Sequence, residues 1–389
     1  MNIIFVSNYL NHHQISFCEN LYKMQGGDFC FIQTEKMTEE RINLGWSNNQ
    51  FSPPYLYEYT QETKEYIKTL FENADIIIYG DTKINFLNFQ LKKTVFIWYY
   101  RERLFKKGQK QKNNLLRMIK LHYKYSIKNR NYDCGVLCAS AYASEDFKRI
   151  KAFTGMKFKW GYFPEYIQYN LDEIIQKKEQ NIIPRIMWAG RLIDWKRAED
   201  ALALAKELKK NGIAFQMEIV GYGDLQVVLN DFIIKEKLET SVCMYGSLTP
   251  EQVREHMLQS DIYLVTSDFN EGWGAVVNEA MNSACAVVSS HAVGAAPFLI
   301  THGFNGLIYT CGNIDELYQS VKMIIDDDLK RKELQRNAYC TMDEWNAGVA
   351  AERLMVLTKG LLRREKNAIY RFEDGICSLA QELPKRWWI

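Results

Sequence analysis

The sequence lacks the features that assign a chain to a membrane or to a secreted class. No apolar run approaches the roughly 18 residues that a membrane-spanning helix needs. The segment from Met1 to Asn8 has neither the basic head nor the small-residue cleavage site of a signal peptide, and it resembles a first β-strand that meets a polar loop. We therefore expect a chain that works in the cytoplasm.

The sequence also lacks a cysteine pattern and a strong net charge. The nine cysteines include no Cys-x-x-Cys pair and no paired Cys/His spacing. Cys134 and Cys138, the closest pair, flank an apolar run and are expected to be small core residues with reduced thiols. The formal net charge is only +2, so only local clustering of charge could indicate an anionic partner.

What the sequence does contain is short apolar runs that alternate with stretches of helical periodicity. This pattern is typical of parallel sheets covered by helices, and 389 residues are enough for two domains. We expect strands at 2–7, 29–32, 75–79, 94–98 and 134–139, and again at 185–189, 215–220, 242–245, 262–266 and 286–290. The expected helices include 196–210, 250–259, 274–283 and 346–364.

A polar linker is expected near 165–182, where the first series of strands ends. The predicted domains are therefore 1–165 and 183–365. The tail 366–389 is expected to return to the N-terminal domain.

Residues 101–130 are strongly basic and contain one acid, Glu102. Leu115, Ile119, Tyr123 and Ile127 recur at four-residue steps, which predicts an amphipathic helix. One interpretation packs this helix on the sheet with a solvated outer face. The other is attraction to anionic phospholipid headgroups or to a lipid diphosphate acceptor. Nucleic acid is not expected, because no recognition motif accompanies the charge. The basic residues are Arg101, Arg103, Lys106, Lys107, Lys110, Lys112, Arg117, Lys120, Lys124, Lys128 and Arg130.

Two glycine-containing loops follow predicted strands of the second half. The first begins at Gly190 and contains Arg191 and Lys196 ahead of a helix, and such cations beside a helix N-terminus suit a diphosphate. The second contains Gly221 and Gly223, which either approach a ligand or make a tight structural turn. The carboxyl ends of neighbouring strands in an open α/β sheet are where ligands bind.

A third loop, after the predicted strand 262–266, has the most specific pattern. Glu271 precedes Gly272-Trp273-Gly274, and Glu279 follows about two helical turns later. Ionised carboxylates accept strong hydrogen bonds from sugar and ribose hydroxyls. The alternative is an acid favoured by the helix dipole together with a surface glutamate.

The order and spacing of these three elements resemble those of the retaining glycosyltransferase family 4, whose members have the GT-B fold. The similarity is strong over about 183–345 and architectural over 1–165. The resemblance implies an α/β chain of two Rossmann-like domains whose parallel sheets face each other across a cleft. It also implies an acceptor-binding N-terminal domain and a C-terminal domain that binds a nucleoside diphosphate sugar.

The resemblance further implies a role for individual residues. Arg191 and Lys196 would hold the donor diphosphate, Glu271 would orient the hexose, and Glu279 would bind the ribose. The remaining donor contacts would come from Gly190, Gly221 and Gly223 and from the backbone amides of Gly272, Trp273 and Gly274.

The sequence departs from the family pattern at three places. The family histidine after the fourth N-terminal strand is absent, and Glu102 is our candidate to replace it. The paired glycines of the first N-terminal loop are replaced by a segment with His12 and His13, which we expect to contact the acceptor or a phosphate. Phe298 stands near the position of a further acid.

No metal or cofactor is expected. Asp326-Asp327-Asp328 imitates a metal-binding cluster, but basic residues follow it closely, which indicates a charged turn between helices. The cations of the first loop would stabilise the leaving diphosphate instead.

The sequence therefore predicts a retaining transfer of a hexose to a glycan or lipid-linked saccharide, in surface polysaccharide biosynthesis. The alternatives are a sugar-nucleotide epimerase of GT-B fold and a non-catalytic partner that stabilises or tethers an active transferase at the membrane.

Overall fold

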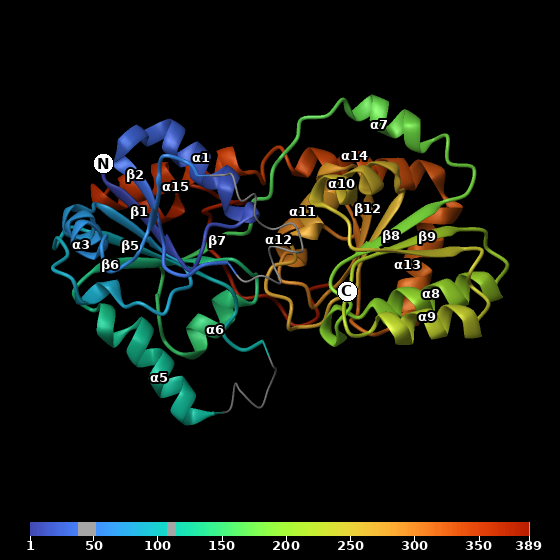
Figure 1. Ribbon diagram of the computed structural model, residues 1–389, viewed down its shortest axis with the longest axis horizontal. Helices are drawn as coiled ribbons and strands as arrows, with labels where there is room; N and C mark the ends of the chain where they lie inside the picture. Colours follow the sequence, from blue (N-terminus) through green and yellow to red (C-terminus); the bar gives the residue numbers. More distant parts are fainter. Residues whose placement is uncertain (38–51, 107–113, 389) are drawn as a thin grey trace. The chain divides into compact units, whose positions relative to one another are not determined.

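The computed structural model describes residues 1–37, 52–106 and 114–388. The chain divides into two compact units. The first comprises Met1–Glu165 and Trp345–Leu383, and the second comprises Tyr166–Glu344 and Pro384–Ile389. Figure 1 shows that each unit is a sheet with helices on both of its faces.

The first unit contains a seven-stranded sheet with the order β3-β2-β1-β4-β5-β6-β7, and every strand pair in it is parallel. The central strands β1, β4 and β5 are fully buried, as strands of a parallel sheet covered on both faces should be. The strands are β1 (Ile3–Ser7), β2 (Phe29–Gln33), β3 (Leu56–Glu58), β4 (Ile76–Tyr79), β5 (Phe96–Arg101), β6 (Asp133–Cys138) and β7 (Lys157–Lys159). The helices described are α1 (His12–Gln25), α3 (Lys64–Asn73), α5 (Leu115–Tyr125), α6 (Ala143–Arg149) and α15 (Ala347–Leu362).

The second unit contains a six-stranded parallel sheet with the order β10-β9-β8-β11-β12-β13. Its strands are β8 (Arg185–Ala189), β9 (Gln216–Val220), β10 (Val242–Gly246), β11 (Ile262–Val265), β12 (Ala286–Ser290) and β13 (Leu307–Tyr309). Its helices are α7 (Leu171–Lys178), α8 (Ala198–Lys210), α9 (Gln226–Lys235), α10 (Pro250–Gln259), α11 (Val276–Asn282), α12 (Ala296–Leu299), α13 (Ile314–Asp326) and α14 (Asp328–Thr341).

The ten predicted strands are confirmed, with small changes at their ends. Three further strands, β3, β7 and β13, were missed because each has only three residues. The stretch expected to be a linker includes helix α7, whose Lys178 is buried. The Nζ of Lys178 donates to the carbonyls of Ser260, Ser283 and Ala284 at 2.5, 2.9 and 2.8 Å. It thereby ties α7 to the ends of α10 and α11.

The domain boundaries differ from the prediction at the C-terminal end of the chain. Helix α15 was placed in the C-terminal domain, but it belongs to the first unit, where it packs against α1. The indole of Trp98 in β5 donates to Thr358 Oγ1 of α15 at 2.8 Å, and both side chains are buried. The last residues, from Pro384 onward, were expected on the N-terminal domain but group with the second unit.

Helix α5 forms within the basic stretch 101–130, as predicted, but its orientation contradicts one interpretation. Leu115, Ile119 and Tyr123 are exposed, so the apolar side of the helix is not packed on the sheet. Three of the basic residues, Lys107, Lys110 and Lys112, lie outside the described residues. Among the helices that the structure describes, none has the length and apolar character to cross a membrane.

Candidate functional site

Hydrogen bonds join the loop that contains Lys196 to the loop that contains Glu271 at the carboxyl ends of β8 and β11. Thr266 Oγ1 donates to the carbonyl of Lys196 at 2.7 Å, and the amide of Asp268 donates to the carbonyl of Trp195 at 2.9 Å. The indole of Trp188 in β8 donates to Thr266 Oγ1 at 2.8 Å. Because β8 and β11 are neighbours in the sheet, these bonds place the cationic loop beside the loop that contains Glu271.

Lys196 and Glu271 form an ion pair at this edge. Lys196 Nζ lies 2.5 Å from Glu271 Oε2, and Ser267 Oγ donates to the same oxygen at 3.0 Å. The two side chains are only 16% and 10% exposed. The resemblance assigns the Lys196 ammonium to the diphosphate and the Glu271 carboxylate to the hexose. These two groups are in contact with each other. A diphosphate bound at Lys196 would share its ammonium with Glu271.

Trp195 brings the two predicted cations close to one ring. Lys196 Nζ lies 4.8 Å and Arg191 Cζ lies 5.8 Å from the centroid of the Trp195 ring. Cations at this distance are attracted by the electron-rich face of an indole. We did not predict Trp195 as a site residue, although its position one residue before Lys196 was a usable signal. Together the three side chains make an electropositive corner suited to an anion.

The glycines of the β9 loop are required by contacts within the protein. A Cβ at Gly221 would lie 1.8 Å from the carbonyl oxygen of Gly190, and one at Gly223 would lie 2.5 Å from that of Leu192. The amide of Leu192 in turn donates to the carbonyl of Tyr222 at 3.0 Å. Gly221 and Gly223 therefore allow the β9 loop to pack on the backbone of the cationic loop. Their role in contacting a donor stays a prediction.

Buried side chains fix the position of the segment Gly272–Gly274. Trp273 is fully buried, its indole donates to Asn278 Oδ1 at 2.8 Å, and its ring lies 6.2 Å from that of Phe298. Gly274 has a φ of +91°, and a Cβ there would lie 2.8 Å from Val293 Cγ1. The Trp273 side chain is therefore a core residue, and only the backbone of this segment can meet a ligand.

Glu279 has an unusual electrostatic environment in α11. Burial raises its pKa from 4.5 to about 7, although the positive charges of Arg254 and Lys196 act in the opposite direction. Lys196 thus interacts with both acids that the sequence selected, Glu271 and Glu279. Titratable groups with strongly perturbed pKa values are concentrated at functional sites.

The candidate residues of the first unit also lie close together. Tyr162 donates its hydroxyl to Glu102 Oε1 at 2.5 Å, and Lys106 forms an ion pair with Glu102 Oε2. The ring of His13 stacks on that of Tyr162 with centroids 5.7 Å apart. We did not predict Tyr162, which connects Glu102 to the histidine pair. No local pattern indicates this contact, because the two residues are 60 positions apart.

We predicted that His12 and His13 lie in a loop, but both residues lie in the first turn of α1. Asn11 caps this helix, and its side chain accepts from the amide of His13 at 3.1 Å. The imidazole rings of His12 and His13 have centroids 3.7 Å apart. Burial lowers the pKa of His12 from 6.5 to about 4, so this imidazole is neutral near pH 7.

An aromatic contact follows β12 in the second unit. The ring of His291 stacks on that of Trp388 with centroids 3.8 Å apart, and Phe269 meets the same imidazole edge-on at 5.2 Å. The Trp388 indole also donates to Thr310 Oγ1 at 3.1 Å. The end of the chain therefore packs near the carboxyl ends of β12 and β13, a position that the sequence did not indicate.

The triple aspartate is engaged in local contacts within α13 and at the start of α14. Asp327 caps α14 and accepts from the amide of Lys330 at 2.9 Å, while Asp326 and Asp328 pair with Lys322 and Arg331. Over residues 1–37, 52–106 and 114–388, no group of three or more His, Cys, Asp or Glu residues is arranged to hold a metal ion.

Sequence comparison identifies a family model and two relatives that each match part of the chain. Residues 172–341 match the family model described as Glycosyl transferases group 1. The chain is 32% identical over 138 residues to the amylovoran biosynthesis glycosyltransferase AmsK of Erwinia amylovora, which is 34% of each protein. An uncharacterized glycosyltransferase of Methanocaldococcus jannaschii is 26% identical over 125 residues, or 32% of this chain and 35% of that protein. The chain thus matches about a third of the length of these curated relatives.

Comparison with solved structures extends over almost the whole chain. Anabaena HepE in complex with UDP has a TM-score of 0.67 at 17% identity, with 93% of this chain and 100% of that chain covered. WaaG, a glycosyltransferase involved in lipopolysaccharide biosynthesis, has a TM-score of 0.60 at 15% identity, with 92% and 100% covered. Both units therefore have the arrangement of strands and helices found in GT-B proteins. Residues 172–341 thus resemble the glycosyl transferases group 1 domain, and the chain has the two-domain GT-B fold.

Proposed function

We propose that this protein is a glycosyltransferase that moves a hexose from a nucleoside diphosphate sugar to a saccharide acceptor with retention of configuration. The similarity of the second unit to the group 1 domain supports the reaction class. HepE has been solved with UDP and with UDP-glucose, which favours a uridine diphosphate sugar as the first donor to test. The similarity to AmsK favours a role in polysaccharide biosynthesis, in the cytoplasm where sugar nucleotides are available.

The observation that carries this proposal is the position of Lys196. Its ammonium contacts the carboxylate of Glu271, interacts with Glu279, and shares the Trp195 ring with Arg191. A nucleoside diphosphate sugar presents a diphosphate between two sets of hydroxyl groups. A cation, Lys196, that interacts with one carboxyl group on each of two neighbouring segments matches this order of chemical groups.

The chemical step in this proposal depends on stabilisation of the leaving group. Negative charge grows on the diphosphate as the bond to the anomeric carbon breaks, and Arg191 and Lys196 stabilise it in this proposal. Glu271 orients the hexose, and Glu279 binds the ribose of the nucleotide. The cations supply the stabilisation for which other transferases use a metal ion.

The first unit is the acceptor-binding domain in this proposal. Glu102 and Tyr162 offer a carboxylate and a phenol to acceptor hydroxyls, and His13 adds an aromatic face. Such a combination of apolar rings and hydrogen-bonding groups suits a glycan or a lipid-linked saccharide.

The test is a search for donor and product with the full-length protein. UDP, GDP, ADP and dTDP sugars are first compared for their ability to raise the melting temperature, and the best donor is then assayed for hydrolysis and for transfer. We expect one donor class to stabilise the protein and to be cleaved slowly without acceptor. A protein that binds no nucleotide sugar would contradict the proposal, and binding without any cleavage or transfer would indicate a non-catalytic partner. Conversion of the donor into its epimer would indicate a sugar-nucleotide epimerase.

A further inference from the structure

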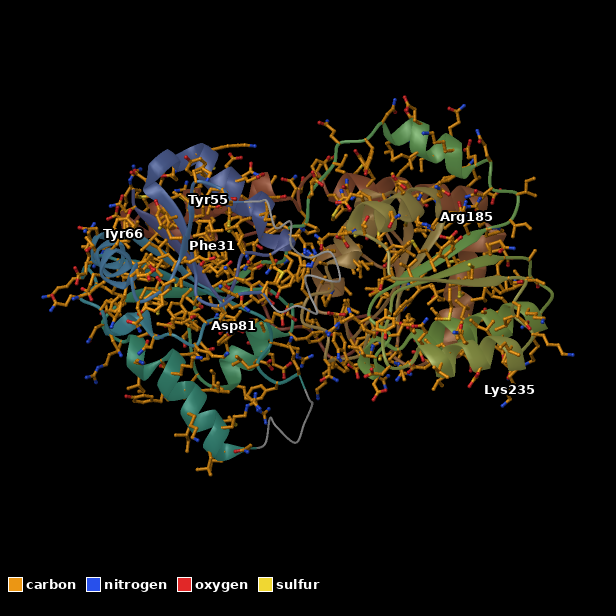
Figure 2. All side chains as sticks on the ribbon, in the orientation of Figure 1. Phe31, Tyr55, Tyr66, Asp81, Arg185 and Lys235 are labelled. Atoms are coloured by element: carbon orange, nitrogen blue, oxygen red, sulfur yellow. The ribbon has the colours of Figure 1, made fainter. Side chains whose placement is uncertain are left out.

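Helix α5 presents its apolar side chains outward. Leu116, Ile119 and Tyr123 are 74%, 56% and 60% exposed, and Leu115 and Ile127 are exposed as well. These residues recur every three or four positions, so they form one continuous stripe along the helix and the turn that follows it. Figure 1 shows α5 at the periphery of the first unit, next to α6, and Figure 2 shows its side chains as sticks. Contiguous exposed apolar surface of this kind marks an interaction site.

Polar contacts on the inner side of α5 determine this orientation. An Arg117 guanidinium nitrogen (Nη2) donates to the carbonyl of Leu104 at 2.9 Å, and His122 Nδ1 donates to the carbonyl of Ile150 at 2.8 Å. Tyr125, the one buried residue of the helix, packs against aromatic rings of the first unit. The inner side is thus anchored by Arg117, His122 and Tyr125, with Met118 and Leu121 half-buried beside them. The aliphatic residues Leu115, Leu116 and Ile119 remain outside.

Positive charge borders the apolar stripe. Lys120, Lys124, Lys128 and Arg130 are all exposed, and the sequence from 114 to 130 contains no acidic residue. In a helix, Lys120 and Lys124 are one turn apart, so they form a basic row beside the stripe. A surface with an apolar stripe and a row of cations is complementary to the headgroups and acyl chains of an anionic bilayer.

We propose that α5 docks this protein on the surface of an anionic lipid bilayer. The apolar stripe enters the boundary between headgroups and acyl chains, and the lysines contact the anionic headgroups. A second copy of the chain is a poorer occupant, because two such helices would bring rows of like charge together. Nucleic acid would leave the apolar stripe exposed. This inference does not depend on the proposed transfer reaction, and its test requires no donor or acceptor.

The experiment measures sedimentation of the full-length protein with vesicles of phosphatidylglycerol and phosphatidylcholine in equal parts. One variant removes the stripe and another removes the charge. The first is Leu116→Ser, Ile119→Ser, Tyr123→Ser, and the second is Lys120→Gln, Lys124→Gln, Lys128→Gln.

Matched controls make the same types of change at exposed positions elsewhere. The apolar control is Val227→Ser, Val228→Ser, Ile234→Ser on α9, and the charge control is Lys64→Gln, Lys177→Gln, Lys366→Gln. All of these side chains are exposed, so the variants should fold like the wild type, which circular dichroism would verify.

We expect the wild type to sediment with anionic vesicles and hardly at all with pure phosphatidylcholine. Each lysine should contribute about fivefold to the partition coefficient, so the charge variant should lose about 10²-fold at about 0.1 M salt. Loss of the apolar stripe should reduce the partition coefficient by a similar factor of about 10². The attraction to lysine should weaken at about 1 M salt, where the screening length falls from about 10 Å to about 3 Å. Both controls should bind like the wild type.

Three results would overturn the inference. The first is a wild type that does not sediment with anionic vesicles. The second is binding that neither α5 variant reduces, which would assign attachment to another surface such as the aromatic end around Trp387 and Trp388. The third is a wild-type dimer in light scattering that becomes a monomer in the α5 variants, because the stripe would then be an interface between copies.

Discussion

Replacement of Glu279 by Gln should remove a pH-dependent penalty on folding. Burial raises the pKa of this carboxyl from 4.5 to about 7. Between these two values the folded protein holds a proton that the unfolded chain has lost, so the free energy of unfolding falls as the pH rises through this window. The displacement of the pKa corresponds to about 3 kcal/mol. Glutamine cannot ionise, so Glu279→Gln should be more stable than the wild type above pH 7 and nearly equal to it near pH 4.5.

The assay is urea unfolding of the wild type and Glu279→Gln at a series of pH values across this window. Glu251 provides the control, because hydrogen bonds with backbone and side-chain partners near the start of α10 lower its pKa. Glu251→Gln should give no gain in stability at high pH. If wild type and Glu279→Gln show the same dependence of stability on pH, the surroundings of this carboxyl in α11 do not raise its pKa.

Three further predictions concern Arg191, Lys178 and the expected independence from metal ions. Arg191→Ala should lower turnover by about 10²–10³-fold, as expected when one preorganised donor to a developing anion is lost, and near-normal turnover would refute its assignment. Lys178→Met should lower the free energy of unfolding by about 2–4 kcal/mol, because the carbonyls that it pairs would be left buried without a donor, whereas the exposed neighbour Lys177→Met should have little effect. Transfer activity should survive EDTA, and loss that Mn²⁺ or Mg²⁺ restores would show that the cations of the β8 loop are not sufficient.

Hydrophobic periodicity was sufficient to predict most of the fold. Strands such as β1 and β8 are apolar runs bounded by polar loops, and the pattern identifies them wherever both faces of a sheet are covered. It could not reveal β3, β7 and β13, which are too short to show a period. Nor could it assign α15 to the first unit, because the contact between Trp98 and Thr358 joins residues 260 positions apart.

The orientation of α5 could not be predicted for a different reason. The sequence identifies which residues share a side of the helix, but not which side faces the protein. Polar residues such as Arg117 and His122 normally indicate a solvated side, and here they anchor the helix to backbone carbonyls. The general rule that aliphatic residues face inward holds for the half-buried Leu121 but fails for Leu116 and Ile119, which are exposed.

The sequence predicted the candidate residues that lie close together along the chain, and it did not reveal contacts between residues that are far apart in the chain. Glu271 and Glu279 lie on one continuous segment, so their spacing alone indicated a common site. The contact of Tyr162 with Glu102 and that of Trp388 with His291 depend on tertiary structure, and no local pattern announces them. The pairing of Lys196 with Glu271 was likewise visible only after folding.

Calorimetry with UDP measures whether Lys196 marks the binding site of a nucleoside diphosphate. Lys206→Gln is the control, because Lys206 pairs with Glu236 on an exposed surface of the second unit. We predict that the wild type and Lys206→Gln bind UDP equally, and that Lys196→Gln binds it about 10–100-fold more weakly, as expected for a lost charge-assisted hydrogen bond. A folded Lys196→Gln protein with the UDP affinity of the wild type would show that Lys196 does not bind the diphosphate.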